Sequence, residues 1–188
     1  MMSGDALIIV DVQNDFCPGG ALAVSRGHEI VPILNSWIAD AAAARVPVFA
    51  SRDWHPADHI SFKARGGPWP PHCIQNTPGA EFHPELKLPA DVRIISKAET
   101  SEVDSYSAFG GTGLAELLRE EGIQRVWIGG LAQDYCVRAT ALDAIRAGFE
   151  VHLIVNATRP VNVKPGDGTE ALEEIRRAGG IVEGSVER

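Results

Sequence analysis

The sequence is poor in cysteine and in basic residues, and each shortage excludes a class of protein. Only three of its 188 residues are cysteine, Cys17, Cys73 and Cys136. Their odd number and wide spacing match neither a secreted disulfide scaffold nor a CxxC pair, so we expect free thiols. Lys and Arg number 17 against 25 Asp and Glu, and no basic run is present. We therefore expect neither a nucleic acid nor an anionic membrane as a partner.

Long apolar runs are missing as well. The first apolar stretch, ALIIVDV at positions 6–12, follows no positively charged segment, and nothing approaches the roughly 20 apolar residues of a membrane span. We expect a cytoplasmic protein. The composition, 45% apolar and 22% charged, is that of an ordinary globular domain, so we expect one domain over residues 1–188.

Short apolar runs alternate along the chain with longer segments of helical period, which indicates βαβ units and a parallel sheet. The strands are continuously apolar, as in a sheet covered on both faces. We predict an α/β fold, a three-layer α/β/α domain with a six-stranded, mainly parallel sheet. Gly122, Gly148 and Gly179 stand where helix C-caps belong, and Thr112 and Asp167 where N-caps belong. The expected strands are residues 6–12, 46–51, 92–96, 125–130, 150–155 and 180–184, and the expected helices residues 29–44, 113–122, 134–148 and 168–179.

Residues 53–91 do not fit this alternation. The segment holds seven of the twelve prolines and four of the six histidines, without a regular period. So long an irregular stretch inside a compact domain is usually disordered or functional, and its Trp, Phe and His content argues against disorder. We predict a functional loop region within the single domain.

Polar residues follow four of the predicted strands. Asp11 ends the first, Asp53 and His55 follow the second, Lys97 ends the third, and a GGLA turn leads from the fourth to Cys136. Ligands of open α/β sheets bind beyond the carboxyl ends of the strands, so we expect these side chains to meet at one edge. Taken singly, each has a simpler interpretation as a loop acid, a surface lysine or a small core residue.

Together these residues form a chemical unit. A helix N-terminus and a nearby ammonium both lower the pKa of a thiol, so we expect Cys136 to be a poised nucleophile beside Lys97. Asp11 would take the thiol proton and later deliver it to a leaving group. Backbone N–H groups of the turn would form an oxyanion hole.

A second group of residues has the composition of a metal site. Asp53, His55, His59 and His72 offer one carboxylate and three imidazoles, which suit a divalent transition metal such as zinc, iron or manganese. Cys73 is a softer and less favoured additional ligand. The alternative is a His- and Pro-rich loop that is simply packed by its aromatic residues.

Five motifs, in order and over almost the whole chain, resemble the nicotinamidase/pyrazinamidase branch of the isochorismatase-like cysteine hydrolases. The resemblance implies the strand order 3-2-1-4-5-6 and the hydrolysis of nicotinamide, and of pyrazinamide, through a Cys136 thioester in NAD salvage. It also implies one divalent metal ion, with zinc favoured over iron or manganese. The motifs are IIVDVQNDFCPGGAL (8–22), SRDWHPADHISF (51–62), WPPHCIQNTPGAEFHP (69–84), VDSYSAF (103–109) and GGLAQDYCV (129–137).

The resemblance also implies a role for each matching residue. The triad would be Asp11, Lys97 and Cys136, and a cis peptide between Leu131 and Ala132 would aim the N–H groups of Ala132 and Cys136 at the oxyanion. Phe16 and Trp69 would sandwich the pyridine ring. The other implied positions are Gln13, which would support the polar network around the substrate, Tyr106, which would line the pocket, and the metal ligands Asp53, His55, His59 and His72.

Three positions depart from the family pattern, and two other functions stay open. Gln133 replaces a common Thr, Asn156 a common Asp, and Ala98 a common Gly.

The nearest alternative is another amidohydrolase of the same superfamily, acting on a different small amide. A second is a non-catalytic protein that senses metals or thiols, although such a sensor would need a resolving cysteine. The sequence leaves open whether the protein is a monomer or a homo-oligomer.

Overall fold

The computed structural model describes residues 1–184, which form six strands, four α-helices and a few short turns of helix. The expected alternation of strands and helices is confirmed. The strands are β1 (Asp5–Val10), β2 (Val48–Asp53), β3 (Arg93–Lys97), β4 (Arg125–Leu131), β5 (Glu150–Arg159) and β6 (Ile181–Glu183), and the helices α1 (Val31–Ala44), α2 (Leu114–Glu120), α3 (Arg138–Arg146) and α4 (Asp167–Arg177).

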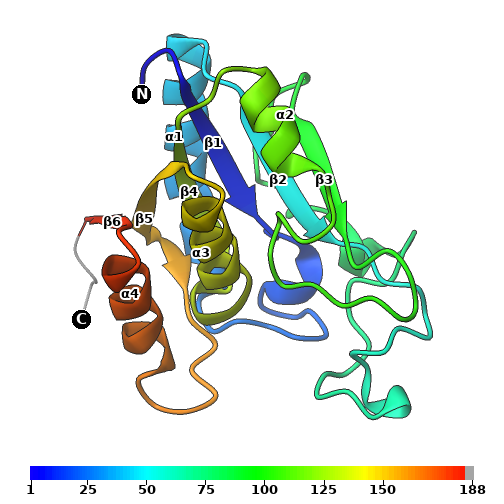
Figure 1. Ribbon diagram of the computed structural model, residues 1–188. Helices are drawn as coiled ribbons and strands as arrows, with labels where there is room; N and C mark the ends of the chain where they lie inside the picture. Colours follow the sequence, from blue (N-terminus) through cyan, green and yellow to red (C-terminus); the bar gives the residue numbers. More distant parts are fainter. Residues whose placement is uncertain (185–188) are drawn as a thin grey trace.

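The sheet has the order β3-β2-β1-β4-β5-β6, and every neighbouring pair is parallel. This confirms the predicted fold class and the strand order that the resemblance implied. All six residues of β1 are buried, because this strand lies between β2 and β4 at the centre of the sheet (Figure 1). The carboxyl ends of β1, β2, β3 and β4 therefore lie at one edge.

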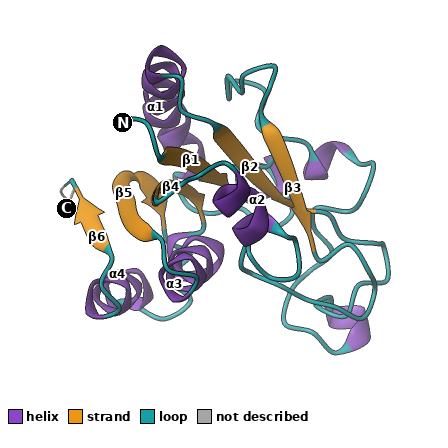
Figure 2. Cartoon of the chain, turned by 45° about the horizontal axis from the view of Figure 1, so that its top comes forward, coloured by secondary structure: helices purple, strands orange, loops and turns teal. Residues whose placement is uncertain are grey.

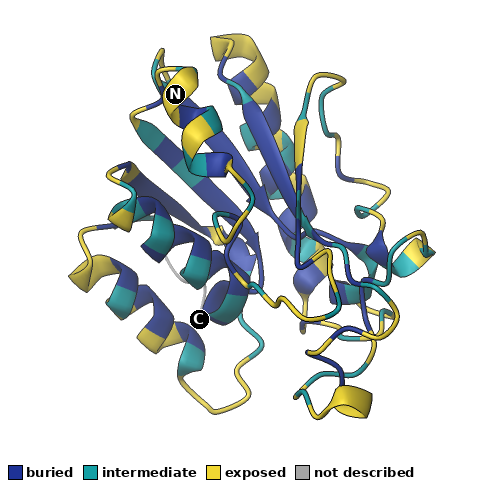
Figure 3. Ribbon diagram, turned by 45° about the vertical axis from the view of Figure 1, so that its right-hand side comes forward, coloured by how far each residue is buried: buried dark blue, intermediate teal, exposed yellow. Residues whose placement is uncertain are grey.

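Helices cover both faces of the sheet, which accounts for the continuously apolar strands. Alternate residues of β1 face opposite ways: Leu7 belongs to the core that α1 covers with Leu34, and Ile8 to the core that α2, α3 and α4 cover. Figure 2 shows α1 on one side of the strands and the other three helices on the opposite side. In Figure 3 the central strands and the inward faces of the helices are largely buried, and the outward faces of the helices are exposed.

The expected C-terminal glycines are confirmed, and the expected N-caps are wrong. Gly122, Gly148 and Gly179 follow α2, α3 and α4 with φ values of 68°, 93° and 103°, in the left-handed region that glycine adopts easily. The N-caps are Gly113 and Gly166, one residue away from the expected Thr112 and Asp167. Asp167 is already the first residue of α4, and its carboxylate accepts the Lys164 N–H at 2.8 Å.

Two elements differ from the sequence-based expectation near the functional edge. Strand β5 extends to Arg159 and so includes Asn156, because an irregularity lets Leu153 pair with Ile128 and Thr158 pair with Gly130. The segment expected as one helix from residue 134 begins as a π-helical turn, Gln133–Val137, before α3. The π-helical turn contains Cys136, and the irregularity between β4 and β5 lies at the start of the GGLA turn that leads to it.

The 53–91 segment is ordered although it contains no α-helix and no strand after β2. His55 pairs with Ile74 and Phe62 with Trp69 through isolated bridges, and this part of the segment lies beyond the carboxyl ends of β2 and β3 (Figure 1), whereas Asp91 lies beside the amino end of β3. Phe62 is buried, and its ring packs against the rings of His55, His59 and His72. Within residues 1–184, no helix combines the length and apolarity that crossing a bilayer needs.

Candidate active site

Asp11 lies where β1 ends and is completely buried. Its φ of 49° turns the chain out of the strand. Ser51 of β2 donates a hydrogen bond to Asp11 Oδ1 at 2.7 Å, while Oδ2 lies 3.0 Å from Lys97 Nζ. Burial raises the pKa of Asp11, Lys97 opposes that rise, and the Asp53 charge adds to it. Among the described residues Oδ2 accepts no hydrogen bond of good geometry, so a lone pair is available for a proton.

Lys97 ends β3 and is 2% exposed. Its ammonium forms ion pairs with Asp11 and Asp53, donates to the Ser105 carbonyl at 3.2 Å and lies 3.6 Å from Cys136 Sγ. Burial works against the charge, but the two carboxylates raise the pKa of Lys97 well above its usual value. The side chain therefore stays cationic at neutral pH and connects three strands with the turn that carries Cys136.

Cys136 is buried in the π-helical turn, where Val137 N–H bonds to Ala132 O at 3.1 Å. Burial raises the pKa of the thiol well above its ordinary value; Lys97 lowers it, and the charges of Asp11 and Asp53 raise it further. The expected fall in this pKa is thus wrong, because desolvation and two carboxylates outweigh one ammonium. The resting group is a thiol, which needs a base to become a nucleophile.

The GGLA turn brings the end of β4 close to the end of β1. Gly130 has φ 135°, and a Cβ atom there would lie 2.0 Å from the Val10 carbonyl oxygen, so only glycine fits. The peptide between Leu131 and Ala132 is cis, as the resemblance implied. All three cysteines are free thiols, which confirms that expectation.

Asp53, His55 and His72 present ligand atoms that all lie within 4.8 Å of one another. Asp53 Oδ2 is 3.4 Å from His55 Nε2 and 3.8 Å from His72 Nε2. The other ring nitrogens are held by backbone carbonyls, His55 Nδ1 at 3.3 Å from Ala98 O and His72 Nδ1 at 2.8 Å from Pro70 O. Such outer contacts orient imidazole ligands toward a metal. Burial favours a raised pKa for Asp53, but Lys97 and His55 hold it below its usual range.

His59 is close to this group but is not part of it. Its ring stacks on His55 at 4.2 Å between centroids. Its Nδ1 lies 2.7 Å from Ser61 Oγ and its Nε2 3.0 Å from the Val103 carbonyl, so both nitrogens already have protein partners. These two contacts of His59 could not be predicted from the sequence, because residue spacing does not determine the orientation of an imidazole ring. Ligation by His59 stays a prediction that requires Nε2 to leave Val103.

A narrow pocket opens beside Cys136. Phe16, Trp69 and Tyr106 line it as the resemblance implied, and Trp69 Nε1 donates to Tyr106 Oη at 2.9 Å. The full set of lining residues is Phe16, Leu22, Val24, Asp53, Trp69, His72, Tyr106, Ala132, Tyr135, Cys136 and Val161. Sequence reasoning missed Leu22, Val24, Tyr135 and Val161. Of these four residues, only Tyr135 could have been inferred from the sequence, because it is adjacent to Cys136.

Gln13 lies behind this pocket, outside its lining. Its amide donates to the carbonyls of Asp53 at 2.8 Å and Ala80 at 3.0 Å, and its oxygen accepts the Asp53 N–H at 2.8 Å. The side chain therefore fixes the backbone of Asp53, which is the supporting part of its expected role. Direct contact with a substrate does not follow from this placement.

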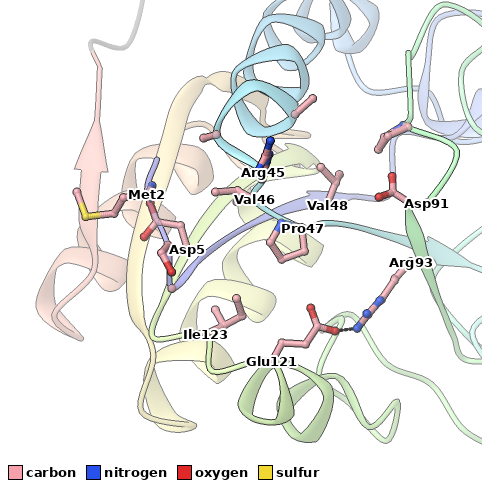
Figure 4. Close-up of a pocket in the computed structure, with 15 residues that line it drawn as sticks. Met2, Asp5, Arg45, Val46, Pro47, Val48, Asp91, Arg93, Glu121 and Ile123 are labelled. Carbon is pink, nitrogen blue, oxygen red and sulfur yellow. Dashed lines mark hydrogen bonds and ion pairs between the residues drawn. The ribbon is translucent and has the colours of Figure 1, made fainter.

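A larger cavity, of about 830 Å³, lies at the opposite end of the strands (Figure 4). Its walls include Asp5, Val48 and Arg93, the first residues of β1, β2 and β3, and Arg93 forms an ion pair with Glu121. None of the cysteines or histidines lines it. The smaller pocket beside Cys136 is therefore the better candidate for the active site.

Comparisons with known proteins agree with this placement. A family model described as the isochorismatase domain matches residues 5–185. The chain belongs to the isochorismatase family. Among relatives in this family, the nicotinamidase of Escherichia coli is 41% identical, with 93% of this chain and 92% of that protein covered. The nicotinamidase/pyrazinamidase of Mycobacterium tuberculosis is 42% identical, with 92% and 95% covered.

A solved structure of the same family is also very similar. The pyrazinamidase of Pyrococcus horikoshii in complex with zinc superposes with a TM-score of 0.93 and is 50% identical. The comparison covers 97% of this chain and 99% of that one. The isochorismatase-family resemblance drawn from the five motifs is therefore confirmed.

Replacing Lys97 with Met should slow alkylation of Cys136 by iodoacetamide at pH 7. Lys97 lowers the pKa of the buried thiol, so its loss raises that pKa and reduces the thiolate fraction, by about tenfold for each pKa unit. Mass-spectrometric peptide mapping measures Cys136 separately from the other two cysteines. Lys63→Met, at an exposed lysine, is the control. An unchanged rate in folded Lys97→Met protein would show that the ammonium does not act on the sulfur.

Proposed function

We propose that this chain is a metal-dependent cysteine amidohydrolase that converts nicotinamide, and pyrazinamide, to the carboxylate and ammonia. The observation that carries the proposal is the position of Cys136 Sγ, 3.6 Å from Lys97 Nζ and next to the buried Asp11, at the wall of an aromatic-lined pocket. The names of the relatives support this substrate class. Formation of nicotinate would place the enzyme in NAD salvage in the cytoplasm.

The first half of the proposed reaction forms a thioester. Asp11 takes the proton of the Cys136 thiol, and the sulfur attacks the carboxamide carbon. The developing oxyanion is stabilised by the backbone N–H groups of Ala132 and Cys136. Asp11 then delivers its proton to the amine nitrogen, the C–N bond breaks and ammonia leaves. The raised pKa of Asp11 suits this exchange, because a carboxyl group that holds a proton more tightly is a better base.

The second half hydrolyses the thioester. Asp11 takes a proton from water, the resulting hydroxide attacks the acyl carbon, and the C–S bond breaks. The thiolate then recovers the proton from Asp11, and the carboxylic acid product loses its own proton to solvent and departs as the carboxylate, so that the enzyme returns to its starting state. Lys97 remains charged throughout, since two carboxylates hold its proton, and it stabilises the sulfur anion that each half produces.

The residues present fit a divalent metal ion. Asp53 offers one free oxygen to His55 and His72, and both imidazoles are oriented by backbone carbonyls. Zinc is the favoured ion, with iron or manganese as alternatives, and His59 is the proposed fourth protein ligand. When bound, such an ion supplies a coordination position for an aromatic ring nitrogen. Phe16 and Trp69 both line the pocket and would hold the ring faces, and His72 lies 5.6 Å from Phe16 between ring centroids.

The position of the cysteines favours an enzyme over a thiol sensor. Cys136 belongs to the core on the side of α2, α3 and α4, whereas Cys17 and Cys73 belong to the core on the side of α1. A redox sensor needs a resolving thiol beside the reactive one, and neither Cys17 nor Cys73 is among the residues that line the pocket beside Cys136. Another small amide as the substrate is the remaining alternative within the same mechanism.

Cys136→Ala should abolish ammonia release from nicotinamide while the protein stays folded. The methyl group cannot form the thioester, so we expect kcat to fall by at least about 1,000-fold. Asp11→Asn should cost at least about 100-fold, because it removes the proton carrier. Cys17→Ala, at a buried cysteine of the other core, should retain activity. Substantial turnover by folded, metal-loaded Cys136→Ala protein would refute covalent catalysis.

Benzamide should be a poorer substrate than nicotinamide by more than about tenfold in kcat/KM, or about 1.4 kcal/mol. It has nearly the same shape but lacks the ring nitrogen. The difference should shrink in His72→Ala, which should also retain less zinc by elemental analysis, whereas His83→Ala should resemble the wild type in both. Equal kcat/KM for the two amides on metal-loaded enzyme would contradict a role for the Asp53, His55 and His72 group in ring binding.

A further inference from the structure

We propose that Gln133 and Asp134 act as a clamp that fixes the β5–α4 connection, residues 160–166, as a rigid wall of the pocket and thereby limits which ring substituents the site admits. The inference rests on the proposed function and extends it to substrate selection. It concerns two side chains that the reaction itself does not use. Gln133 is also one of the positions where the chain departs from the family pattern.

Asp134 holds the connection by its backbone. The residue is 7% exposed, and each carboxylate oxygen accepts one N–H, from Val161 at 2.9 Å and from Asn162 at 2.8 Å. Hydrogen bonds to a charged acceptor are stronger than neutral ones. Asp134 precedes Cys136 by two residues in the same π-helical turn, so the connection is attached directly to the turn that carries the nucleophile.

Gln133 holds the segments on either side of the connection. Its amide oxygen accepts a hydrogen bond from Thr158 Oγ1 of β5 at 2.9 Å, and its Nε2 donates to Gly168 O in the first turn of α4 at 2.8 Å. The Asn162 side chain adds a bond from Gly168 N–H at 2.8 Å. A shorter Thr side chain at position 133 cannot span this distance. We therefore expect Gln133 to hold these segments more firmly than a Thr at the same position would.

The connection needs such a clamp because it has almost no core of its own. Residues 162–166 are all exposed, and Val163 is 61% exposed. Exposed segments with few apolar contacts open easily unless polar bonds hold them. Pro160 and Val161 are partly buried, and Val161 lines the pocket together with Cys136 and Tyr135. The distance from this wall to the sulfur is thus set by the bonds to Asp134.

The test compares nicotinamide with a panel of nicotinamides methylated at each free ring carbon. One added methylene in a well-fitted pocket changes kcat/KM by roughly tenfold or more. Asp134→Ala should raise kcat/KM for at least one methylated amide, relative to nicotinamide, by about tenfold. Val161→Ala, which shortens the wall and keeps the clamp, should favour the same methylated amide. Lys164→Ala, at an exposed side chain of the same connection, should leave the ratios unchanged.

Amide hydrogen exchange provides a readout that is independent of activity. The peptide containing residues 160–166 should exchange at least about tenfold faster in Asp134→Ala and in Gln133→Thr than in the wild type, and at the wild-type rate in Lys164→Ala. If the wild type released no ammonia from nicotinamide, the proposed function would fail while this readout still tested the clamp. Wild-type exchange in folded Gln133→Thr and Asp134→Ala, or unchanged substrate ratios in Val161→Ala, would overturn the inference.

Discussion

The site depends on one buried cation. Lys97 is nearly inaccessible to water, and a buried charge is costly unless ion pairs and hydrogen bonds compensate for it. Its partners come from the ends of β1 and β2, from the Ser105 carbonyl and from the turn before α3. The ends of these strands and the turn must therefore meet at one point. The parallel sheet provides that meeting point, because its order places β3, β2, β1 and β4 side by side.

Asp53 connects the catalytic group around Lys97 with the candidate metal ligands, which the sequence analysis treats as separate. One of its oxygens pairs with Lys97, and the other faces His55 and His72. The charge that stabilises the sulfur and the charge that would hold a metal ion therefore come from neighbouring atoms of one carboxylate. Gln13 fixes the backbone of this residue through two hydrogen bonds, to its carbonyl and from its N–H, so the shared group has a defined position. In such a network, a metal ion bound between Asp53, His55 and His72 would also alter the surroundings of Lys97.

Features that depend on where the strands end could be predicted from the sequence. Features that depend on the direction of a side chain could not. Asp11, Lys97 and Cys136 follow apolar runs, so their meeting could be predicted from the fold class. The rise in the pKa of Cys136 could not, since it depends on how deeply the thiol is buried. The hydrogen bond of His59 to Val103 and the contribution of Val161 to the pocket depend on loop paths that no pattern encodes. Ala98 is a further example. Its φ of 53° lies in the left-handed region that glycine usually occupies, and its carbonyl oxygen contacts His55 Nδ1.

The central claim is that Cys136, buried and protonated at rest, becomes acylated because Asp11 removes its proton next to Lys97. The most direct measurement is mass spectrometry of the intact, metal-loaded enzyme quenched in acid during turnover of nicotinamide, followed by peptide mapping. The account predicts a transient mass gain equal to one nicotinoyl group, located on Cys136 and absent from Asp11→Asn. Release of ammonia in a single turnover, with no acylated Cys136 at any quench time and with a chemically prepared Cys136 thioester shown to survive the quench, would contradict it.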